Sequence, residues 1–353
     1  ATAAQVIVPT PNAAPQINME SFCENLGTHT YCLSAELPAP PATPLEWGAI
    51  TGYSPYRRRI RVGIMGRWSP AMRINNVQPP VIRMGGQRAR DLAQEGIDVI
   101  DLGPSSPHYV TPKHIIDAGV KALYDGYTNH APALGLPEFK DALAEKLYSN
   151  NRIQADPDKG IMVVPGSQQG LYYAVNAYVG PGDEVLLVEP AWGSFRQQVE
   201  LSEASPVAVV LSSEEEYHLS YEALDRCATD RTKLLIFNNP QNPTGRVYTR
   251  VELEDVARFA QDRDLLVLCD ETYEYFVYDS NEHISLASIP GMLERTVTSF
   301  TFNKSYGMSG WRLGCMVAPA ELLEPMTRVQ EYTASFVAPF IQMAGVAALR
   351  GPQ

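Results

Sequence analysis

The fold and chemistry of this chain are decided by one stretch, Ser299-Phe-Thr-Phe-Asn-Lys304-Ser-Tyr-Gly-Met-Ser-Gly-Trp-Arg312-Leu-Gly314. Lys304 carries an amine on a long side chain, and this amine becomes a nucleophile when its pKa falls. Apolar neighbours and a second cation, Arg312, favour the neutral amine, which is the form that makes a Schiff base with an aldehyde. Taken alone, the stretch also fits a surface lysine before a glycine-rich turn.

Two segments further upstream favour the chemical interpretation. Asn238-Asn-Pro-Gln-Asn242-Pro-Thr-Gly245 follows the apolar run 234–237, and Asp270-Glu-Thr-Tyr273 follows the apolar run 265–269. Both runs are typical of buried strands, and ligands bind at the carboxyl ends of strands in open α/β sheets. Each segment has an ordinary alternative, a turn for the first and a helix N-cap for the second. Their order ahead of Lys304 is much harder to obtain by chance.

Composition limits the class of protein. The chain has 353 residues, enough for two domains, and 45% of them are hydrophobic, as in ordinary globular enzymes. The net charge of −12 argues against a nucleic-acid surface, and the basic cluster at 57–61 fits a solvated or subunit-contacting loop better than a polyanion site. The sequence has no apolar run of about 18 residues and no signal-peptide pattern, so we expect no membrane partner.

Cysteine and histidine usage bears on the compartment and on metals. The five cysteines are odd in number and lack CxxC spacing, and Cys269 and Cys315 are expected to be buried. This usage suits a reducing, cytoplasmic location. The six histidines are scattered along the chain, so we expect no metal site.

Strands and helices alternate from residue 74 onward, which predicts a mostly parallel sheet covered by helices. The expected strands are 99–102, 161–164, 184–188, 207–211, 234–237, 265–269 and 297–302. The expected helices include 112–124, with Thr111 as its N-cap, together with 137–150 and 168–179.

The whole pattern resembles the pyridoxal-phosphate enzymes of fold type I, specifically the class I and II aminotransferases. The resemblance covers about 74–351 and includes Gly135-Leu-Pro-Glu-Phe139, Gly166-Ser-Gln-Gln169 and Glu189-Pro-Ala-Trp192. It implies an α/β fold, in which a large domain is built on a mostly parallel, seven-stranded sheet and is joined by a smaller α+β domain.

The resemblance and the composition together divide the chain into four regions. Residues 1–66 are rich in proline and are expected to form an irregular N-terminal extension. Residues 116–318 would form the large cofactor-binding domain. Residues 67–115 would be the N-terminal part of the small domain, and 319–353 would begin its C-terminal part, which we expect to be incomplete.

The resemblance implies roles for four residues around the cofactor ring. Lys304 would form a Schiff base with pyridoxal phosphate and move a proton between substrate and cofactor. Asp270 would pair with the protonated ring nitrogen, so that the ring accepts electrons. Tyr273 and Asn242 would hydrogen-bond the phenolic oxygen of the ring, although a tyrosine of this kind can also simply fill a core.

Further residues would hold the phosphate and the face of the ring. The backbone amides of Ser167 and Gln168 at a helix start, together with the Arg312 guanidinium, would bind the phosphate. The remaining implied contacts are a hydroxyl from Thr301, a side-chain donor from Asn303 where many relatives have serine, an aromatic wall from Trp192 and, across a homodimer with shared active sites, Tyr127. Core packing is the alternative for Trp192.

The implied reaction is the transfer of an amino group between an amino acid and a 2-oxo (keto) acid. The alternative is a β- or γ-eliminating or replacing enzyme, or an ACC-synthase-like lyase acting on a sulfonium amino acid. Ser105, in place of the usual glycine of the substrate wall at 102–109, and the long extension keep this alternative open. A ligand-sensing regulator would carry a basic helix-turn-helix arm, and 1–66 has no such pattern. The family's arginine that clamps the substrate carboxylate is expected beyond Gln353 or in another segment.

Overall fold

The computed structural model describes residues 70–78, 81–100 and 107–353, without the side chains of 81–84. The helices in this part are α2 (Val81–Gln94), α3 (Lys113–Tyr124), α4 (Pro137–Lys146), α5 (Ser167–Tyr178), α6 (Ser194–Leu201), α7 (Tyr221–Asp225), α8 (Arg250–Asp262), α9 (Ala320–Glu331) and α10 (Pro339–Arg350). The strands are β1 (Ile161–Val164), β2 (Glu184–Glu189), β3 (Ser205–Val210), β4 (Thr232–Asn238), β5 (Leu266–Asp270), β6 (Thr296–Thr301) and β7 (Gly314–Val317). The expectations for 1–66 and for Ser105 fall outside the described residues.

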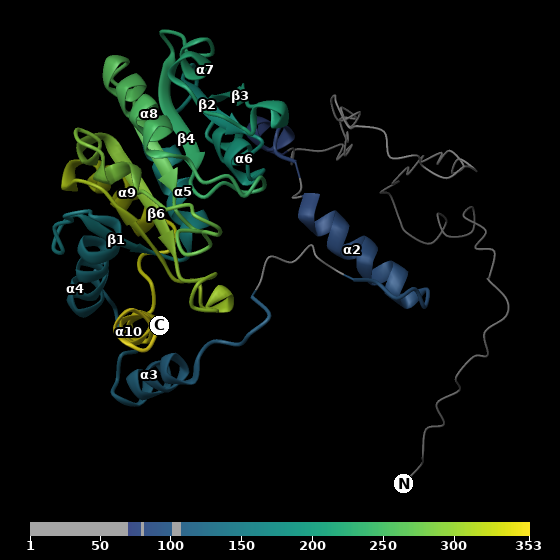
Figure 1. Cartoon of the computed structure of the whole chain (residues 1–353). Helices are drawn as coiled ribbons and strands as arrows, with labels where there is room; N and C mark the ends of the chain where they lie inside the picture. The colour runs from purple at the N-terminus through teal and green to yellow at the C-terminus, as the bar shows by residue number, and fades with distance from the viewer. Residues whose placement is uncertain (1–69, 79–80, 101–106) are drawn as a thin grey trace, which may run out of the picture. The chain divides into compact units, whose positions relative to one another are not determined.

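These strands form one sheet in the order β1-β7-β6-β5-β4-β2-β3. β7 is antiparallel to both of its neighbours, and the other pairings are parallel. The expected mostly parallel, seven-stranded sheet is therefore confirmed. Every strand except β7 points the same way, so their carboxyl ends meet at a single edge of the sheet (Figure 1).

Helices cover both faces of this sheet, because side chains of successive strand residues point to opposite faces. On one face Val185 and Leu187 belong to a buried cluster with residues of α5, α6 and α9. On the other face Leu186 and Val188 pack with residues of α7 and α8. Beside them, a third cluster joins β1 and β7 to α3, α4 and α10. The result is a three-layer arrangement of helices, sheet and helices.

Local sequence explains several element boundaries. Thr249 caps α8 through a capping box, in which its side chain accepts from the Glu252 amide and the Glu252 carboxylate accepts from the Thr249 amide. α4 begins with Pro137, whose fixed φ suits the first helical position. The expected burial of Cys269 and Cys315 is confirmed, because neither side chain is exposed.

Three local expectations need correction. Val99 and Ile100 are irregular instead of starting a strand, and 101–102 lie outside the described residues. Pro112, not Thr111, is the N-cap of α3, because the Thr111 hydroxyl donates to the Gly307 carbonyl at 2.7 Å. β7 is missing from the expected strands because four residues directly after a glycine-rich stretch give little periodic signal.

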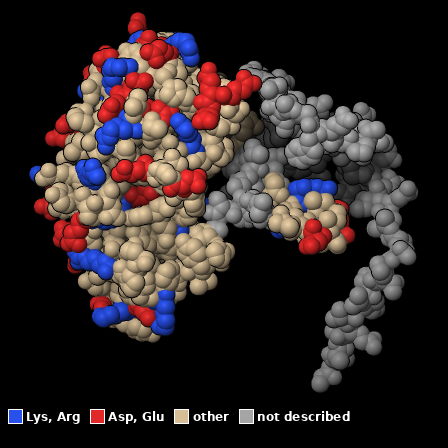
Figure 2. Space-filling model, in the orientation of Figure 1, with Lys and Arg blue, Asp and Glu red and all other residues tan. Residues whose placement is uncertain are grey.

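The described residues also bear on membrane spanning and on surface charge. None of their helices combines the length and the apolar character that a membrane span requires. On the face of the sheet-containing body drawn in Figure 2, basic and acidic side chains are interspersed.

We predict that Gly314→Ala destabilises the protein by roughly 1–3 kcal/mol, the usual effect of overpacking a core. A Cβ at this position would lie 2.7 Å from the Ser167 amide nitrogen and 3.0 Å from the Phe300 carbonyl oxygen, and these backbone atoms cannot move aside cheaply. The measurement is the midpoint of urea-induced unfolding. Gly180→Ala is the matched control, since its Cβ would have no neighbour within 4 Å. Equal midpoints for the two variants would contradict the close contact.

Candidate active site

The carboxyl edge of the sheet brings together most residues that the sequence singled out. The register pairs Asn238 of β4 with Asp270 of β5, and Asp270 with Ser299 of β6. Thr301 at the end of β6 pairs with Gly314 of β7, and Lys304 follows three residues after Thr301. Adjacent, register-matched strands therefore place the loops that carry Asn242, Tyr273 and Lys304 next to one another.

Residues from the distant segment 109–111 hold the loop that carries Lys304. The Tyr109 hydroxyl lies within hydrogen-bond distance of the carbonyl oxygens of Lys304 (3.1 Å) and Ser305 (3.3 Å). Thr111 binds the Gly307 carbonyl, as noted above, and also accepts a bond from the Trp311 indole at 3.0 Å. Sequence reasoning missed Tyr109 and Thr111 because nothing local marks a contact with a loop almost 200 residues away.

Burial sets the protonation tendency of Lys304. Removal from water lowers the pKa of its ammonium group, while the negative charge of Asp270 acts in the opposite direction. Its Nζ lies 5.8 Å from the centre of the Tyr273 ring. The shift is toward the neutral amine, which is the direction that the sequence predicts. The cause is burial, whereas the expected second cation, Arg312, instead points its guanidinium at the Pro165 carbonyl, 3.3 Å away.

Asp270 is a buried carboxylic acid, with 6% of the residue exposed. Its Oδ1 accepts from the Thr272 hydroxyl at 2.6 Å and from the Thr272 amide at 3.2 Å. Burial raises the pKa of Asp270 to about 6, and these hydrogen bonds and the Lys304 charge only partly offset the rise. A buried acid with this few local partners would gain from a cation or an N–H donor placed beside it.

Tyr273 and Asn242 come from neighbouring loops and contact each other. The Asn242 amide nitrogen lies 3.4 Å from the Tyr273 hydroxyl oxygen, a long hydrogen bond. Burial, followed by the charge of Asp270, raises the pKa of Tyr273. The phenol is therefore protonated at neutral pH and can donate a hydrogen bond to a further acceptor.

The start of α5 and Arg312 form a cradle for an anion. Gly166 precedes α5 with φ 85°, and a Cβ there would lie 2.3 Å from the Arg312 Nη2. Glycine alone lets the guanidinium approach this closely. The first amides of α5, including those of Ser167 and Gln168, have no acceptor inside the helix and lie at its positive end. Arg312 itself has φ 58°, an unfavourable conformation of about 1–3 kcal/mol that is typical of functional sites.

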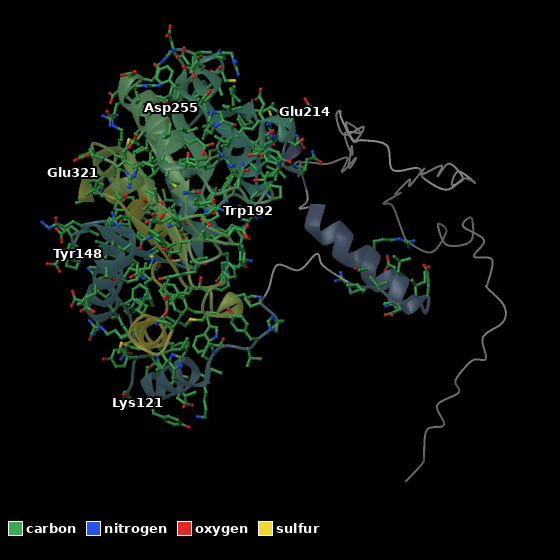
Figure 3. The ribbon with its side chains drawn as sticks, in the orientation of Figure 1. Lys121, Tyr148, Trp192, Glu214, Asp255 and Glu321 are labelled. Atoms are coloured by element: carbon green, nitrogen blue, oxygen red, sulfur yellow. The ribbon has the colours of Figure 1, made fainter. Side chains whose placement is uncertain are left out.

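Three of the remaining predicted residues, Thr301, Asn303 and Trp192, follow or end strands at this edge, whereas Tyr127 lies in the loop after α3 and is not placed beside them. Thr301 is buried, and its hydroxyl accepts from the Asn303 amide at 3.3 Å. The Asn303 Oδ1 is buried without a hydrogen-bond partner. Trp192, labelled in Figure 3, is half-buried in the loop after β2, and its ring meets Phe195 edge-on at 5.5 Å. Tyr127 is half-buried just after α3.

These residues fit pyridoxal phosphate. The cradle at Gly166 and Arg312 suits a phosphate, because helix N-termini and guanidinium groups both bind that anion. The buried carboxyl of Asp270 suits a protonated ring nitrogen, and the paired Tyr273 and Asn242 suit a phenolic oxygen. Lys304, with its lowered pKa, suits the aldehyde. Among the described residues, no cluster of His, Cys, Asp and Glu could hold a metal ion.

Comparison with known proteins agrees with this arrangement. Residues 97–353 match the model of the family "Aminotransferase class I and II". An aspartate aminotransferase of Pyrococcus abyssi is 42% identical over 278 residues, covering 79% of this chain and 70% of that protein. An aromatic-amino-acid aminotransferase 2 of Thermococcus litoralis is 41% identical with the same coverage of both chains.

Solved structures give the same result. An aspartate aminotransferase from Thermus thermophilus with maleate superimposes with a TM-score of 0.77 at 32% identity, covering 80% of this chain and 73% of that one. An aromatic aminotransferase from Pyrococcus horikoshii gives 0.70 at 42% identity, over 74% of this chain and 70% of that one.

We predict that Asp270→Asn stabilises the cofactor-free protein at pH 8. The folded-state pKa of Asp270 rises from 3.8 to about 6, so the folded state binds the proton more tightly than the unfolded state. The stability due to that proton is complete below about pH 4 and is lost as pH rises through about 6. Asparagine does not titrate. Above about pH 6 the free energy of unfolding of the variant should therefore exceed that of the parent by on the order of 2–3 kcal/mol.

The measurement is urea unfolding of both proteins at pH 4 and at pH 8, without cofactor. Glu271, whose pKa burial raises to about 8, titrates in both proteins and cancels in the comparison. A stability difference that does not grow between the two pH values would show that Asp270 is ionised at little cost.

Proposed function

This chain belongs to the class I and II aminotransferases, which are transferases dependent on pyridoxal phosphate, and from this premise we propose how its own residues carry the transfer of an amino group. The supporting observation is the meeting of three groups at one sheet edge. These are the half-buried Lys304 amine, the buried Asp270 carboxyl and the anion cradle of Gly166 and Arg312. When bound, the cofactor supplies an electrophilic carbon for the amine and an electron-accepting ring.

Lys304 would hold the cofactor through its amine, and the same amine would move a proton at the substrate's α-carbon. Burial lowers the pKa of Lys304, which shifts the group toward the neutral, proton-accepting amine. Asp270 holds a negative charge against the ring nitrogen, since a cation at that point offsets the cost of burying its carboxylate. Tyr273 donates a hydrogen bond to the phenolic oxygen, and Asn242 orients it.

Phosphate binding belongs to the first turn of α5, through Ser167 and Gln168, and to Arg312. Thr301 would add a hydroxyl donor, because its oxygen accepts from the Asn303 amide while its own proton stays available. The Asn303 Oδ1 is buried without a hydrogen-bond partner, and as an acceptor it does not bind phosphate. Trp192 is the wall against the ring face.

The substrate pair is an amino acid and a 2-oxo acid. The relatives named above act, by their names, on aspartate and on aromatic amino acids, so we propose a donor from these two classes. No described residue favours the alternative lyase reaction. Assay of a panel of amino acids with 2-oxoglutarate as acceptor distinguishes the two classes of donor.

We predict that Lys304→Ala lowers the transamination rate by several orders of magnitude, as loss of a covalent nucleophile does. After incubation with pyridoxal phosphate and reduction with borohydride, the parent should carry the cofactor on the peptide that contains Lys304. The variant should carry none. Lys140→Ala is the control for nonspecific labelling, because Lys140 is a buried lysine that donates to the Asp158 carbonyl away from the site. If Lys304→Ala were labelled as strongly as the parent, Lys304 would not be the residue that binds the cofactor.

We further propose a cytoplasmic homodimer with shared active sites, in which Tyr127 serves the neighbouring subunit. α3, which ends just before Tyr127, buries Ile115 against the body but exposes Val120, Leu123 and Tyr124 on another face. Exposed apolar stripes of this kind are typical of interfaces. The division into a large domain (116–318) and parts of a small one (67–115 and 319–353) belongs to the same proposal.

Light scattering of the purified protein should therefore give twice the mass of one chain. Val120→Lys should shift the mass toward that of a single chain, because a charge in an apolar interface is costly to bury. Arg231→Met, in the turn just before β4, should leave the mass unchanged. An active species with the mass of one chain would contradict shared active sites.

A further inference from the structure

The turn that carries Tyr273 contains two buried acids that the reaction does not use. Glu271 and Glu274 are three residues apart and stand on either side of Tyr273 in the segment after β5. Backbone bonds close the turn, from the Glu274 amide to the Glu271 carbonyl at 3.1 Å and from the Phe276 amide to the Tyr273 carbonyl at 2.8 Å. Each acid is anchored to a different part of the fold.

Glu274 is anchored to α4 and the turn that follows it. Both of its carboxylate oxygens lie 2.6 Å from the Lys146 Nζ, and one also accepts from the Asn151 side chain at 2.8 Å. The side chains of the ion pair are only 9% and 11% exposed. The Lys146 ammonium also lies 4.5 Å from the centre of the Phe300 ring of β6. This pair therefore ties the outer end of the turn to α4 and to the sheet.

Glu271 anchors the inner end of the same turn. Its Oε1 accepts from the Ser285 hydroxyl at 2.7 Å and from the Leu286 amide at 3.3 Å. Its Oε2 lies 3.5 Å from the His283 Nε2. Its backbone amide extends the sheet by donating to the Ser299 carbonyl at 2.9 Å. Both ends of the turn are thus fixed, and Tyr273 stands between them.

A buried ion pair is seldom an efficient source of stability. The cost of removing two charges from water often cancels their attraction, so apolar replacements can be equally stable. What such a pair does supply is a defined geometry, because both charges stay buried only while they face each other. The ion pair between Lys146 and Glu274 fixes the position of Glu274, and because Glu274 directly follows Tyr273, it also constrains the backbone of Tyr273.

We propose that Lys146 and Glu274 are positioning residues for the reaction, which hold the Tyr273 hydroxyl beside Asn242 and in line for its hydrogen bond to the cofactor. The proposal rests on the function assigned to Tyr273 above. Tyr273 and Asn242 lie 3.4 Å apart, already at the long end of a hydrogen bond. A small rotation of the turn is therefore enough to break the contact, so the anchor at Glu274 decides whether it forms.

The test uses the pH midpoint of the absorbance change of the bound cofactor in the holoenzyme. A hydrogen bond from Tyr273 stabilises the deprotonated chromophore, so losing it raises the midpoint. Tyr273→Phe measures the full shift. We expect Lys146→Met, Glu274→Gln and the double variant each to raise the midpoint by half of that shift or more, with the double close to the singles.

The signs separate positioning from direct electrostatics. Through-space charge alone would make Lys146→Met raise the midpoint and Glu274→Gln lower it, with no net effect in the double variant. Opposite signs would therefore overturn the proposal, and so would unchanged midpoints in all three variants. If Tyr273→Phe itself left the midpoint unchanged, the assignment of Tyr273 would fail first, which is a separate outcome.

Hydrogen exchange of the cofactor-free protein gives a second measurement. The amides of Glu274 and Phe276 should exchange faster in Lys146→Met than in the parent. Arg231→Met is the control for removing a cation from a buried acid elsewhere, because the largely exposed Arg231 pairs with the buried Glu184 at the start of β2. Equal exchange of the turn in both variants would overturn the anchor, whereas faster exchange in Lys146→Met alone supports it.

Discussion

The direction and register of the sheet are the constraint on which the rest of the structure depends. Every strand except β7 ends at one edge, so loops that are far apart in sequence must share that edge. β7 runs the opposite way and begins there, which brings Arg312 to the start of α5. Gly314 makes this possible, since any side chain would meet the backbone of α5. The amine, the carboxyl and the anion cradle are therefore neighbours because of strand geometry.

Burial gives these groups their chemical character. The same removal from water lowers the pKa of Lys304 and raises that of Asp270. Both shifts disfavour charge, so the site without cofactor holds groups that gain by meeting partners of the right kind. A protonated ring nitrogen next to Asp270 would be such a partner. The buried groups of the site therefore lower the stability of the cofactor-free protein, and binding the cofactor would offset that cost.

The polar groups behind the site serve geometry more than charge. Tyr109 and Thr111 hold the backbone of the Lys304 loop, and the anchors of Glu271 and Glu274 hold the Tyr273 turn. Each of these contacts fixes a loop rather than touching the cradle of Gly166 and Arg312. Loops at the edge of a sheet have few backbone partners of their own, so side chains from other elements supply the missing bonds.

The sequence by itself determined the sheet strands from β1 to β6 and the buried cysteines, and it singled out the residues that we propose for the cofactor, because all of these depend on local signals. Apolar runs mark strands, and Lys304, Asp270 and Asn242 stand at fixed distances from the ends of such runs. Only the tertiary structure decided that Thr111 bonds the Gly307 carbonyl instead of capping α3, and that Lys146 pairs with Glu274. Those partners lie 196 and 128 residues apart. No local pattern encodes such contacts, since they arise only when the packing of helices on the sheet brings the two segments together.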